Sequence, residues 1–502
     1  MKMISLTPAS VVHLLLVSFI GAGMFLVWYS TKWGAGLISD TFQYVASARN
    51  LVVGNGFSIP YGDGELEPMT KYPPMYSIVL AVFELGGATA LQNARWVNIL
   101  LFGVNTYLIF ISSQKLTGSD FFALLASVLF SISFILIEVH SWALSEPLYI
   151  CLTLCTFLLL EKYFKETKRI WLILASLLAA SAFLTRYVGL SLVVAAAVVI
   201  LPGNRGIKQK LMDILLFGLV ATLPVVVWTV RGYRLTETLN DRTIAYHPLT
   251  LKNYVSAIDV GMKWFLPSPF VEGNEKLLLI LISVLFLSGA IVYWLRFSSD
   301  RLLAFLHDLR PKKRIILLHI AYLFAFPAMI VFSKTWVDPE IGLSDRVLSP
   351  ILVSLLVLLV TLLSFLWNRF RKTRVLVLLI SFGLITYYLT GTILGVQRWH
   401  EGGIGIARRG WNRSEVIQAL QTYSSYSIYT NSNSSLYLWS DRAGYSIREF
   451  ESLKQDGTDK EVLLIIFHHV PPTGDRLNRL IDGLTLLKED RIVSIYEFGP
   501  AP

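Results

Sequence analysis

Residues 11–29 read VVHLLLVSFIGAGMFLVWY and contain no Asp, Glu, Lys or Arg. A helix needs about 20 predominantly apolar residues to cross the hydrocarbon core of a bilayer, so this run predicts a membrane-spanning helix. The residues at its end, Trp28-Tyr29-Ser30-Thr31-Lys32, do not form the small-residue cleavage site of a secretory signal peptide. We therefore interpret the run as a retained anchor.

Ten further apolar runs follow along the chain. They explain why 54% of the 502 residues are hydrophobic and only 16% are charged, whereas soluble domains carry about 25% charged residues. The fifth and sixth runs are short and are separated by Arg186 and Tyr187, so we expect them to be tilted, partial or re-entrant. The sequence thus predicts a polytopic α-helical membrane protein with about 11 spans, at residues 11–29, 91–112, 121–138, 146–161, 170–185, 188–201, 211–230, 276–296, 314–333, 347–367 and 375–396.

Lysine and arginine residues gather in every second turn between the apolar runs. If the N-terminus is cytoplasmic, all of these basic turns face the cytoplasm, as the positive-inside rule requires. The net charge of +10 is then a consequence of topology, and no basic helix or aromatic-basic stripe indicates nucleic-acid binding. We expect a multi-pass protein of the plasma (inner) membrane with a cytoplasmic N-terminus, and the endoplasmic reticulum remains an alternative. The basic turns comprise residues 115, 162–169, 205–210, 310–314 and 369–374.

The composition changes at about residue 397, where the apolar runs end. We expect residues 1–396 to form a transmembrane domain with a first outer loop at 30–90, and residues 397–502 to form a small extracytoplasmic α/β domain. This tail acts either as a lid or acceptor-docking domain or as structural support. Within it the sequence predicts helices at 414–421 and 476–487 and strands at 427–429, 462–467 and 491–498.

The first outer loop begins with a segment of mixed polarity from Ile38 to Leu51. Its apolar residues recur at helical spacing, which predicts an interfacial helix lying along the membrane surface. Gly54-Asn55-Gly56 would end this helix. Further along, Met69-Thr70-Lys71-Tyr72-Pro73-Pro74 predicts a stiff turn that leads into another apolar stretch. The apolar positions of the helix are Phe42, Val45, Ala46, Val52 and Val53.

Asp40 lies where the first span meets this helix, and two interpretations of it remain open. It can be the N-cap of the helix, with Gln43 three residues later as in a capping box. A carboxylate held at a membrane surface beside a wet outer cavity is also where a general base is expected. The two roles do not exclude one another.

Several short motifs occur in a fixed order on the predicted outer side. Asp40 and Tyr44 come first, then Asn50 and Gly54–Gly56, and then Lys71-Tyr72-Pro73-Pro74. Ser145-Glu146-Pro147-Leu148-Tyr149 opens the fourth run, and Leu184-Thr185-Arg186-Tyr187-Val188-Gly189 separates the fifth run from the sixth. In this order the chain resembles the membrane glycosyltransferases of the GT-C superfamily, in particular the branch of dolichyl-phosphate-mannose–protein mannosyltransferases and the aminoarabinose transferase of lipid A. The resemblance covers about residues 1–200 and, more weakly, Asp345–Pro350.

The resemblance implies a role for each matching residue. Asp40 is implied to be the catalytic base, Lys71 to contact the donor phosphate, and Glu146 to be a second catalytic acid on the outer side. Tyr44 is implied to contact the substrate. The family often has two adjacent acids in the first loop, whereas Thr41 follows Asp40 here. The sequence therefore leaves a divalent-metal cofactor unassigned.

Arg186 and Arg346 lie at the outer ends of apolar runs, against the usual preference of basic residues for the cytoplasmic side. The planar guanidinium fork suits phosphate oxygens, so both arginines are candidates for binding the lipid phosphate. The alternatives are snorkelling to the membrane surface and a structural ion pair with an acid.

Together these residues predict an inverting glycosyltransferase. It would move a hexosyl or pentosyl group from a polyprenyl-phosphate-linked donor in the membrane to an extracytoplasmic lipid, glycan or protein acceptor. In such a transfer a base takes the proton of the acceptor hydroxyl, and cations stabilise the departing phosphate. Two other functions remain open. One is a transporter or flippase of lipid-linked sugars, although the chain has no internal repeat; the other is a polymerase or ligase of surface polysaccharide.

Overall fold

The computed structural model describes residues 8–202, 205–238, 244–266, 311–423, 425–457 and 460–499. The chain divides into two units. We call the first the membrane unit, which comprises Met1–Val27, Ile99–His140 and Ser145–Gly395. We call the second the loop–tail unit, which comprises Trp28–Asn98, Ser141–Leu144 and Val396–Pro502. The first outer loop groups with the tail in this division. The functional split into a transmembrane catalytic domain at 1–396 and a separate domain at 397–502 stays a prediction.

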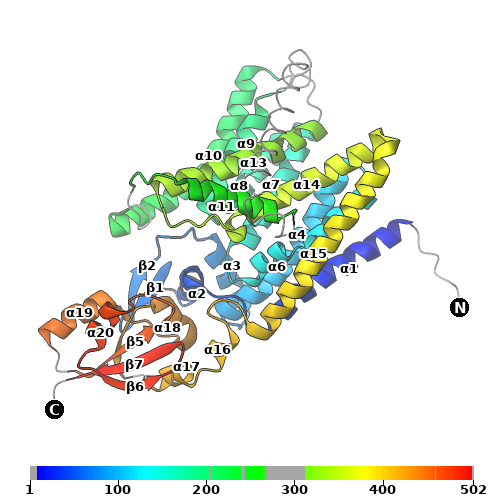
Figure 1. Ribbon diagram of the computed structural model, residues 1–502. Helices are drawn as coiled ribbons and strands as arrows, with labels where there is room; N and C mark the ends of the chain where they lie inside the picture. The colour runs from blue at the N-terminus through cyan, green and yellow to red at the C-terminus, as the bar shows by residue number, and fades with distance from the viewer. Residues whose placement is uncertain are drawn as a thin grey trace. The chain divides into compact units, whose positions relative to one another are not determined.

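The membrane unit is helical because its residues are apolar, and a helix satisfies every backbone hydrogen bond within the segment itself. Among the described residues, seven helices are long and apolar enough to cross a membrane, or eight if the bent pair α5–α6 is one span. The helices (Figure 1) are α1 (Pro8–Ser30), α4 (Ala90–Thr117), α5 (Asp120–Ser131), α6 (Phe134–Ser141), α7 (Glu146–Glu166), α8 (Arg169–Phe183), α9 (Leu190–Ile200), α10 (Ile207–Thr236), α11 (Leu251–Lys263), α13 (Pro311–Trp336), α14 (Asp345–Arg369) and α15 (Arg374–Gly402), with short 3₁₀ turns at Tyr187–Gly189 and Arg371–Thr373.

Each predicted apolar run that lies in the described part of the chain coincides with helix. The run 276–296 lies outside the described residues. The two short runs form α8 and α9, which are 15 and 11 residues long. Both are shorter than the roughly 20 residues of a full span. The number of spans stays a prediction.

The predicted span 121–138 is a bent pair of helices and not one straight helix. Helix α5 ends at Ser131 and α6 begins at Phe134, with an angle of 56° between them. The break frees the backbone carbonyl of Ile132, which accepts a hydrogen bond from the hydroxyl of Thr392 on α15 at 2.5 Å. A backbone group that is freed within a membrane protein needs such a partner.

Helices α7 and α13 share a buried aromatic cluster. The ring of Phe157 packs edge-on against His319 and Tyr322, with centroid distances of 4.9 and 5.5 Å. The hydroxyl of Tyr322 donates to that of Tyr149 at 3.2 Å. Aromatic pairs of this geometry add about 0.5–1.5 kcal/mol beyond the burial of their area. These contacts stabilise α7, whose first residue is Glu146.

The loop–tail unit contains a five-stranded sheet with the strand order β4-β3-β5-β7-β6 (Figure 1). Strand β3 pairs in parallel with β4 and β5, whereas β7 is antiparallel to β5 and β6. Every side chain of β5 is buried, and Phe450 of α19 belongs to the same core. The elements are α2 (Ser39–Val52), β1 (Ser58–Tyr61), β2 (Glu65–Pro68), α3 (Met75–Glu84), α16 (Arg409–Asn412), α17 (Glu415–Ala419), a 3₁₀ turn (Leu420–Thr422), β3 (Ser427–Thr430), α18 (Asn433–Ser440), β4 (Tyr445–Ser446), α19 (Ile447–Asp456), β5 (Val462–Phe467), α20 (Asp475–Ile481), β6 (Thr485–Glu489) and β7 (Val493–Phe498).

The tail has the predicted α/β pattern, with one element wrong. The three predicted strands correspond to β3, β5 and β7, and the helix predicted at 414–421 corresponds to α17 and the following 3₁₀ turn. The helix predicted at 476–487 instead ends at Ile481. Gly483 adopts a left-handed φ of +74° there, as glycine does just after many helices. The residues beyond it form β6 and pair with β7.

Helix α2 has the predicted extent, and part of its apolar face packs against the tail. It ends at Val52, and Gly54 follows with a φ of +87°. Phe42 and Ala46 are buried against Tyr437 of α18, with the rings of Phe42 and Tyr437 5.1 Å apart. Part of the apolar face of α2 is thus covered by protein, and the position of the helix along the membrane surface stays a prediction.

Backbone hydrogen bonds join three distant segments of the loop–tail unit at Gly36 and Leu37, an arrangement we call the three-segment junction. The amide of Gly36 donates to the carbonyl of Ser141 at 2.8 Å, and the amide of Ala143 donates to the carbonyl of Gly36 at 2.9 Å. The amide of Ile406 donates to the carbonyl of Leu37 at 3.0 Å. Because α2 begins two residues after Leu37, the junction anchors the chain that enters this helix.

We expect Gly405→Ala to destabilise the loop–tail unit. Gly405 pairs with Leu37 in the junction and has a φ of +59°. An added Cβ would lie 2.3 Å from the carbonyl oxygen of Leu37 and 2.6 Å from the ring of Trp142. Overpacking of this kind costs about 1–3 kcal/mol, and the left-handed backbone adds strain for alanine. The measurement is thermal unfolding of the purified full-length chain in detergent. Gly402→Ala, where a Cβ meets nothing within 4 Å, is the control; equal effects of the two substitutions would contradict the prediction.

Candidate active site

Asp40 lies in the first turn of α2 and is not its N-cap. The helix begins at Ser39, and the extended residue before it is Ile38, with φ −142° and ψ −179°. The amide of Ile38 donates to the hydroxyl of Thr41 at 3.2 Å, and the amide of Thr41 donates to the carbonyl of Ile38 at 3.0 Å. Thr41 therefore supplies the side-chain link at this helix start. The interpretation of Asp40 as N-cap, with Gln43 completing a capping box, is wrong.

The carboxylate of Asp40 accepts a hydrogen bond from the hydroxyl of Tyr72 at 2.9 Å. Asp40 is partly exposed, whereas the aromatic side chains behind Tyr72 are buried. The ring of Tyr44 lies 5.4 Å from that of Tyr72 and packs edge-on against Tyr76 at 5.2 Å. The hydroxyl of Tyr76 donates to the side chain of Asn98 at 3.2 Å. This row of rings holds Tyr72 in place and so orients the carboxylate.

Tyr44 is buried, with 3% of its surface exposed. Tyr44 lies between the rings of Tyr72 and Tyr76. This position suits support of Tyr72 better than contact with a substrate. The sequence did not assign a role to Tyr72, because 32 residues separate it from Asp40 and no spacing rule connects the two positions.

Lys71 is exposed beside this group. Its ammonium nitrogen lies 5.9 Å from the centroid of the Tyr72 ring, which is near the outer limit of a cation–π contact. Pro73 and Pro74 follow, and α3 begins at Met75. Because proline restricts both its own φ and the residue before it, the turn that carries Lys71 and Tyr72 is stiff. The loop–tail unit thus brings Asp40, Tyr44 and Lys71 together around Tyr72.

The membrane unit brings the other three predicted residues together. Glu146 is the first residue of α7 and only 1% exposed. One of its carboxylate oxygens lies 2.8 Å from a terminal nitrogen of Arg186 and 3.5 Å from Nε of Arg346. Arg186 occupies an extended position between α8 and α9, and Arg346 is the second residue of α14. The sequence left open an ion pair of Arg186 with an acid, and that ion pair is present.

In this cluster the carboxylate of Glu146 pairs with two guanidinium groups. A carboxylate that is buried so fully is stable only when it is paired with cations. Arg186 and Arg346 keep 21% and 27% of their side-chain surfaces exposed, and Arg186 also donates to the hydroxyl of Ser145 at 3.4 Å. Since both guanidinium groups keep exposed surface, the cluster is suited to binding an anion as well as to holding Glu146.

The donor set does not fit a bound metal ion. Within the part of the chain that the structure describes, no three His, Cys, Asp or Glu side chains lie close enough to share one. The carboxylate of Glu146 is already paired with two guanidinium groups. Their positive charges would repel a metal ion. We therefore assign no step to a metal.

Comparisons with known proteins agree with this architecture. Residues 71–228, which include Lys71, Glu146 and Arg186, match the family described as dolichyl-phosphate-mannose-protein mannosyltransferase. The crystal structure of ArnT from Cupriavidus metallidurans bound to undecaprenyl phosphate superimposes with a TM-score of 0.62, covering 96% of this chain and 97% of that one at 11% identity. The chain has the GT-C fold.

Two further similarities accompany the GT-C fold. The apo state of the same ArnT matches with a TM-score of 0.53 at 11% identity and the same coverage. An uncharacterised protein of Aquifex aeolicus (strain VF5) is 31% identical over 167 residues, which are 32% of this chain and 32% of that protein. The match thus spans about a third of the length of this relative. The predicted fold class, a polytopic helical GT-C-like protein with a small C-terminal α/β region, is confirmed, and the chain is an integral membrane protein.

Proposed function

We propose that the chain is an inverting glycosyltransferase that moves a sugar from a polyprenyl-phosphate donor to an extracytoplasmic acceptor. The observation that carries this proposal is the Asp40 carboxylate, which Tyr72 orients at 2.9 Å beside the exposed Lys71. The GT-C fold and the match of residues 71–228 to a dolichyl-phosphate-mannose family support it. The undecaprenyl phosphate bound in the similar ArnT structure supports a polyprenyl-phosphate carrier.

The proposed reaction needs one base and a group of cations. Asp40 takes the proton of the acceptor hydroxyl while the hydroxyl oxygen attacks the anomeric carbon of the donor. The bond from that carbon to the phosphate oxygen breaks, and its electron pair leaves with the polyprenyl phosphate. Attack on the face opposite the leaving group inverts the anomeric carbon. The role of Tyr72 is to hold the carboxylate in one orientation.

The phosphate becomes more negative as it leaves, so cations that contact it lower the barrier. We assign this role to Lys71 in the loop–tail unit, and to Arg186 and Arg346 in the membrane unit. Glu146 is proposed to position the two arginines, because it contacts both of them and is buried. With the N-terminus in the cytoplasm, Asp40 would face the outer side of the membrane. The acceptor is a lipid, a glycan or a protein.

The test uses the purified full-length chain in detergent with a polyprenyl-phosphate-linked sugar. Addition of an acceptor should release polyprenyl phosphate and form a glycosylated product of inverted configuration. Uptake of the lipid-linked sugar into liposomes without a covalent product would favour the flippase. Turnover only with a diphosphate-linked oligosaccharide would favour the polymerase or ligase.

We expect Lys71→Gln to reduce kcat/KM for the donor roughly ten- to hundredfold. The substitution removes a charged hydrogen-bond donor to the phosphate, and such a contact contributes about 1.5–3 kcal/mol. The measurement is initial rate against donor concentration. Lys32→Gln removes the same charge from another exposed lysine of the loop–tail unit and should leave the rate within about twofold. If both variants lose the same activity, general surface charge explains the effect and Lys71 has no specific role.

A further inference from the structure

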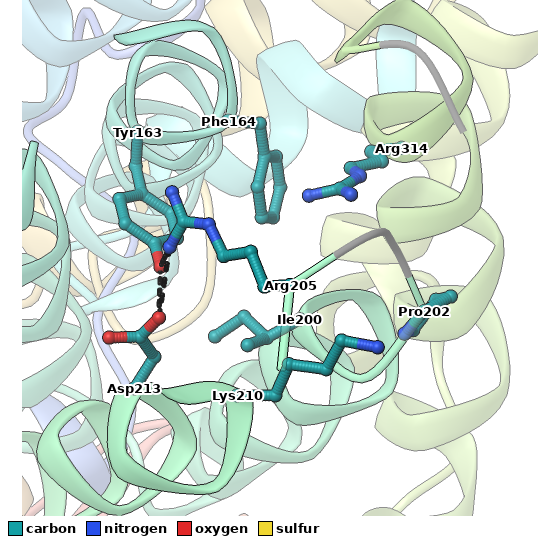
Figure 2. Close-up of a pocket in the computed structure, with 8 residues that line it drawn as sticks. All are labelled: Tyr163, Phe164, Ile200, Pro202, Arg205, Lys210, Asp213 and Arg314. Atoms are coloured by element: carbon teal, nitrogen blue, oxygen red, sulfur yellow. Dashed lines mark hydrogen bonds and ion pairs between the residues drawn. The ribbon is translucent and has the colours of Figure 1, made fainter. Parts of the chain in front are cut away.

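A second polar site lies in the membrane unit, where the ends of α7 and α9 meet the beginnings of α10 and α13. It is a shallow recess of about 230 Å³, part of which is open to solvent. Figure 2 shows the side chains of Arg205, Lys210 and Arg314 around it, with Tyr163 and Asp213 on one side. None of these residues belongs to the candidate active site.

The recess is built around a buried acid. Asp213 is 1% exposed, and its carboxylate accepts a hydrogen bond from the hydroxyl of Tyr163 at 2.6 Å. Arg205 donates to the same carboxylate oxygen at 3.0 Å and to the Tyr163 hydroxyl at 2.5 Å. A buried ion pair with such additional hydrogen bonds has a defined geometry. Arg205 is therefore held in place with one face toward the recess (Figure 2).

The cations outnumber the acids at this site. Arg205, Lys210 and Arg314 line the recess against the single carboxylate of Asp213. The guanidinium carbon of Arg314 lies 5.3 Å from the centroid of the Phe164 ring. Among the described residues, no protein acceptor binds the ammonium group of Lys210 at hydrogen-bond or ion-pair distance. Three cations at one recess favour an anionic ligand, because an anion reduces their mutual repulsion.

The place of the recess along α7 separates it from the candidate active site. Glu146 is the first residue of α7, and Tyr163 lies 17 residues further along the same helix. At 1.5 Å per residue this is about 26 Å, close to the thickness of the hydrocarbon core of a bilayer. The recess thus lies near the opposite membrane surface, which is the cytoplasmic one in the predicted orientation.

Apolar side chains continue from the recess along α10. Leu211, Met212 and Leu215 are each more than half exposed, and they lie within five residues after Lys210. Such a surface on a membrane-spanning helix contacts the acyl chains of lipids. A ligand that combines a negative head group with acyl chains fits both parts of this surface, whereas a free anion fits only the recess.

We propose that this recess binds the phosphodiester head group of an anionic membrane lipid. The phosphate oxygens contact Lys210, Arg314 and the outward face of Arg205, and the acyl chains lie along Leu211 and Leu215. Basic pockets between membrane helices on the cytoplasmic side bind anionic head groups in this way. The proposal does not depend on the proposed sugar transfer.

The test measures lipid retention by the purified full-length chain with native mass spectrometry. The chain is equilibrated with phosphatidylglycerol or with phosphatidylcholine of the same acyl chains. The wild-type chain should retain phosphatidylglycerol in preference. Lys210→Gln and Arg314→Gln should each weaken this binding roughly fivefold, because a cation near an anionic head group contributes about that factor.

Lys208→Gln is the matched control, since Lys208 lies on the same first turn of α10, is exposed and does not line the recess. It should change retention by less than twofold. Equal loss in Lys208→Gln and Lys210→Gln would overturn the proposal and leave only general surface charge. Thermal unfolding of the same chain is measured with inorganic phosphate and with phosphatidylglycerol. If phosphate raises the unfolding temperature as much as phosphatidylglycerol does, the lipid assignment is overturned in favour of a soluble anion. If Arg314→Gln fails to fold, the Lys210→Gln variant decides the outcome, because Lys210 is partly exposed.

Discussion

Asp40→Asn should reduce turnover at least about a hundredfold while leaving the fold intact. The substitution keeps the size of the side chain but removes the group that accepts the proton, and loss of a general base costs about 10²–10⁴ in rate. Asp40 does not cap α2, and weakening the bond from Tyr72 should cost about 1 kcal/mol of stability. The measurements are the rate of polyprenyl-phosphate release and the thermal unfolding of the same sample.

Two further variants separate the charge of Asp40 from its orientation. Tyr72→Phe removes the hydroxyl that holds the carboxylate but keeps the base, so we expect a smaller loss of about tenfold, equivalent to one hydrogen bond. Glu65→Gln neutralises an exposed acid of the same loop, on β2, and should have no effect. Full turnover of Asp40→Asn would remove the base from the proposed reaction.

Glu146→Gln should destabilise the membrane unit by about 3–5 kcal/mol, because it leaves two arginines beside a buried neutral group. The carboxylate is 1% exposed and lies 2.8 Å from Arg186 and 3.5 Å from Arg346. The free energy of unfolding in detergent is the measurement. Glu166→Gln, at the other end of α7 and on the exposed surface, makes the same chemical change and should alter stability by less than about 0.5 kcal/mol.

The double variant Glu146→Gln/Arg186→Gln tests the cause of this effect. Removing one arginine together with the acid lowers the excess of positive charge, so the double variant should be more stable than Glu146→Gln alone. If Glu146 positions the arginines, Glu146→Asp should recover part of the kcat that Glu146→Gln loses. Its KM for the donor should stay above the wild-type value. A Glu146→Gln variant as stable as the wild type would show that this charge does not hold the cluster.

The helices of the membrane unit could be predicted from sequence because the bilayer imposes one requirement on every segment. An apolar run without charges satisfies its backbone only as a helix, and each run in the described residues coincides with one. The bend between α5 and α6 could not be predicted, because neither Gly nor Pro marks Ile132. Its carbonyl is satisfied by Thr392, which lies 260 residues away.

Two features of the loop–tail unit depend on more than apolar spacing. The apolar spacing of α2 indicated a buried face, but periodicity does not tell lipid from protein, and Tyr437 covers Phe42 and Ala46. The end of α20 depends on the left-handed Gly483, and a glycine at this position is a helix-ending signal in the sequence itself. The candidate site residues came from the order of short motifs. The contact between Asp40 and Tyr72 depends on tertiary structure alone. The same holds for the contacts of Glu146 with the two arginines.

The three-segment junction has a consequence for biosynthesis. Leu37 leaves the ribosome more than 360 residues before Ile406 and Gly405, which complete its hydrogen bonding. At about 5–20 residues per second this delay is roughly 20–70 s. Throughout this time the nascent chain inserts helix after helix while the segment leading to Asp40 lacks its last partner. A chain that terminates before Gly405 therefore lacks the hydrogen bond that completes the junction at Leu37.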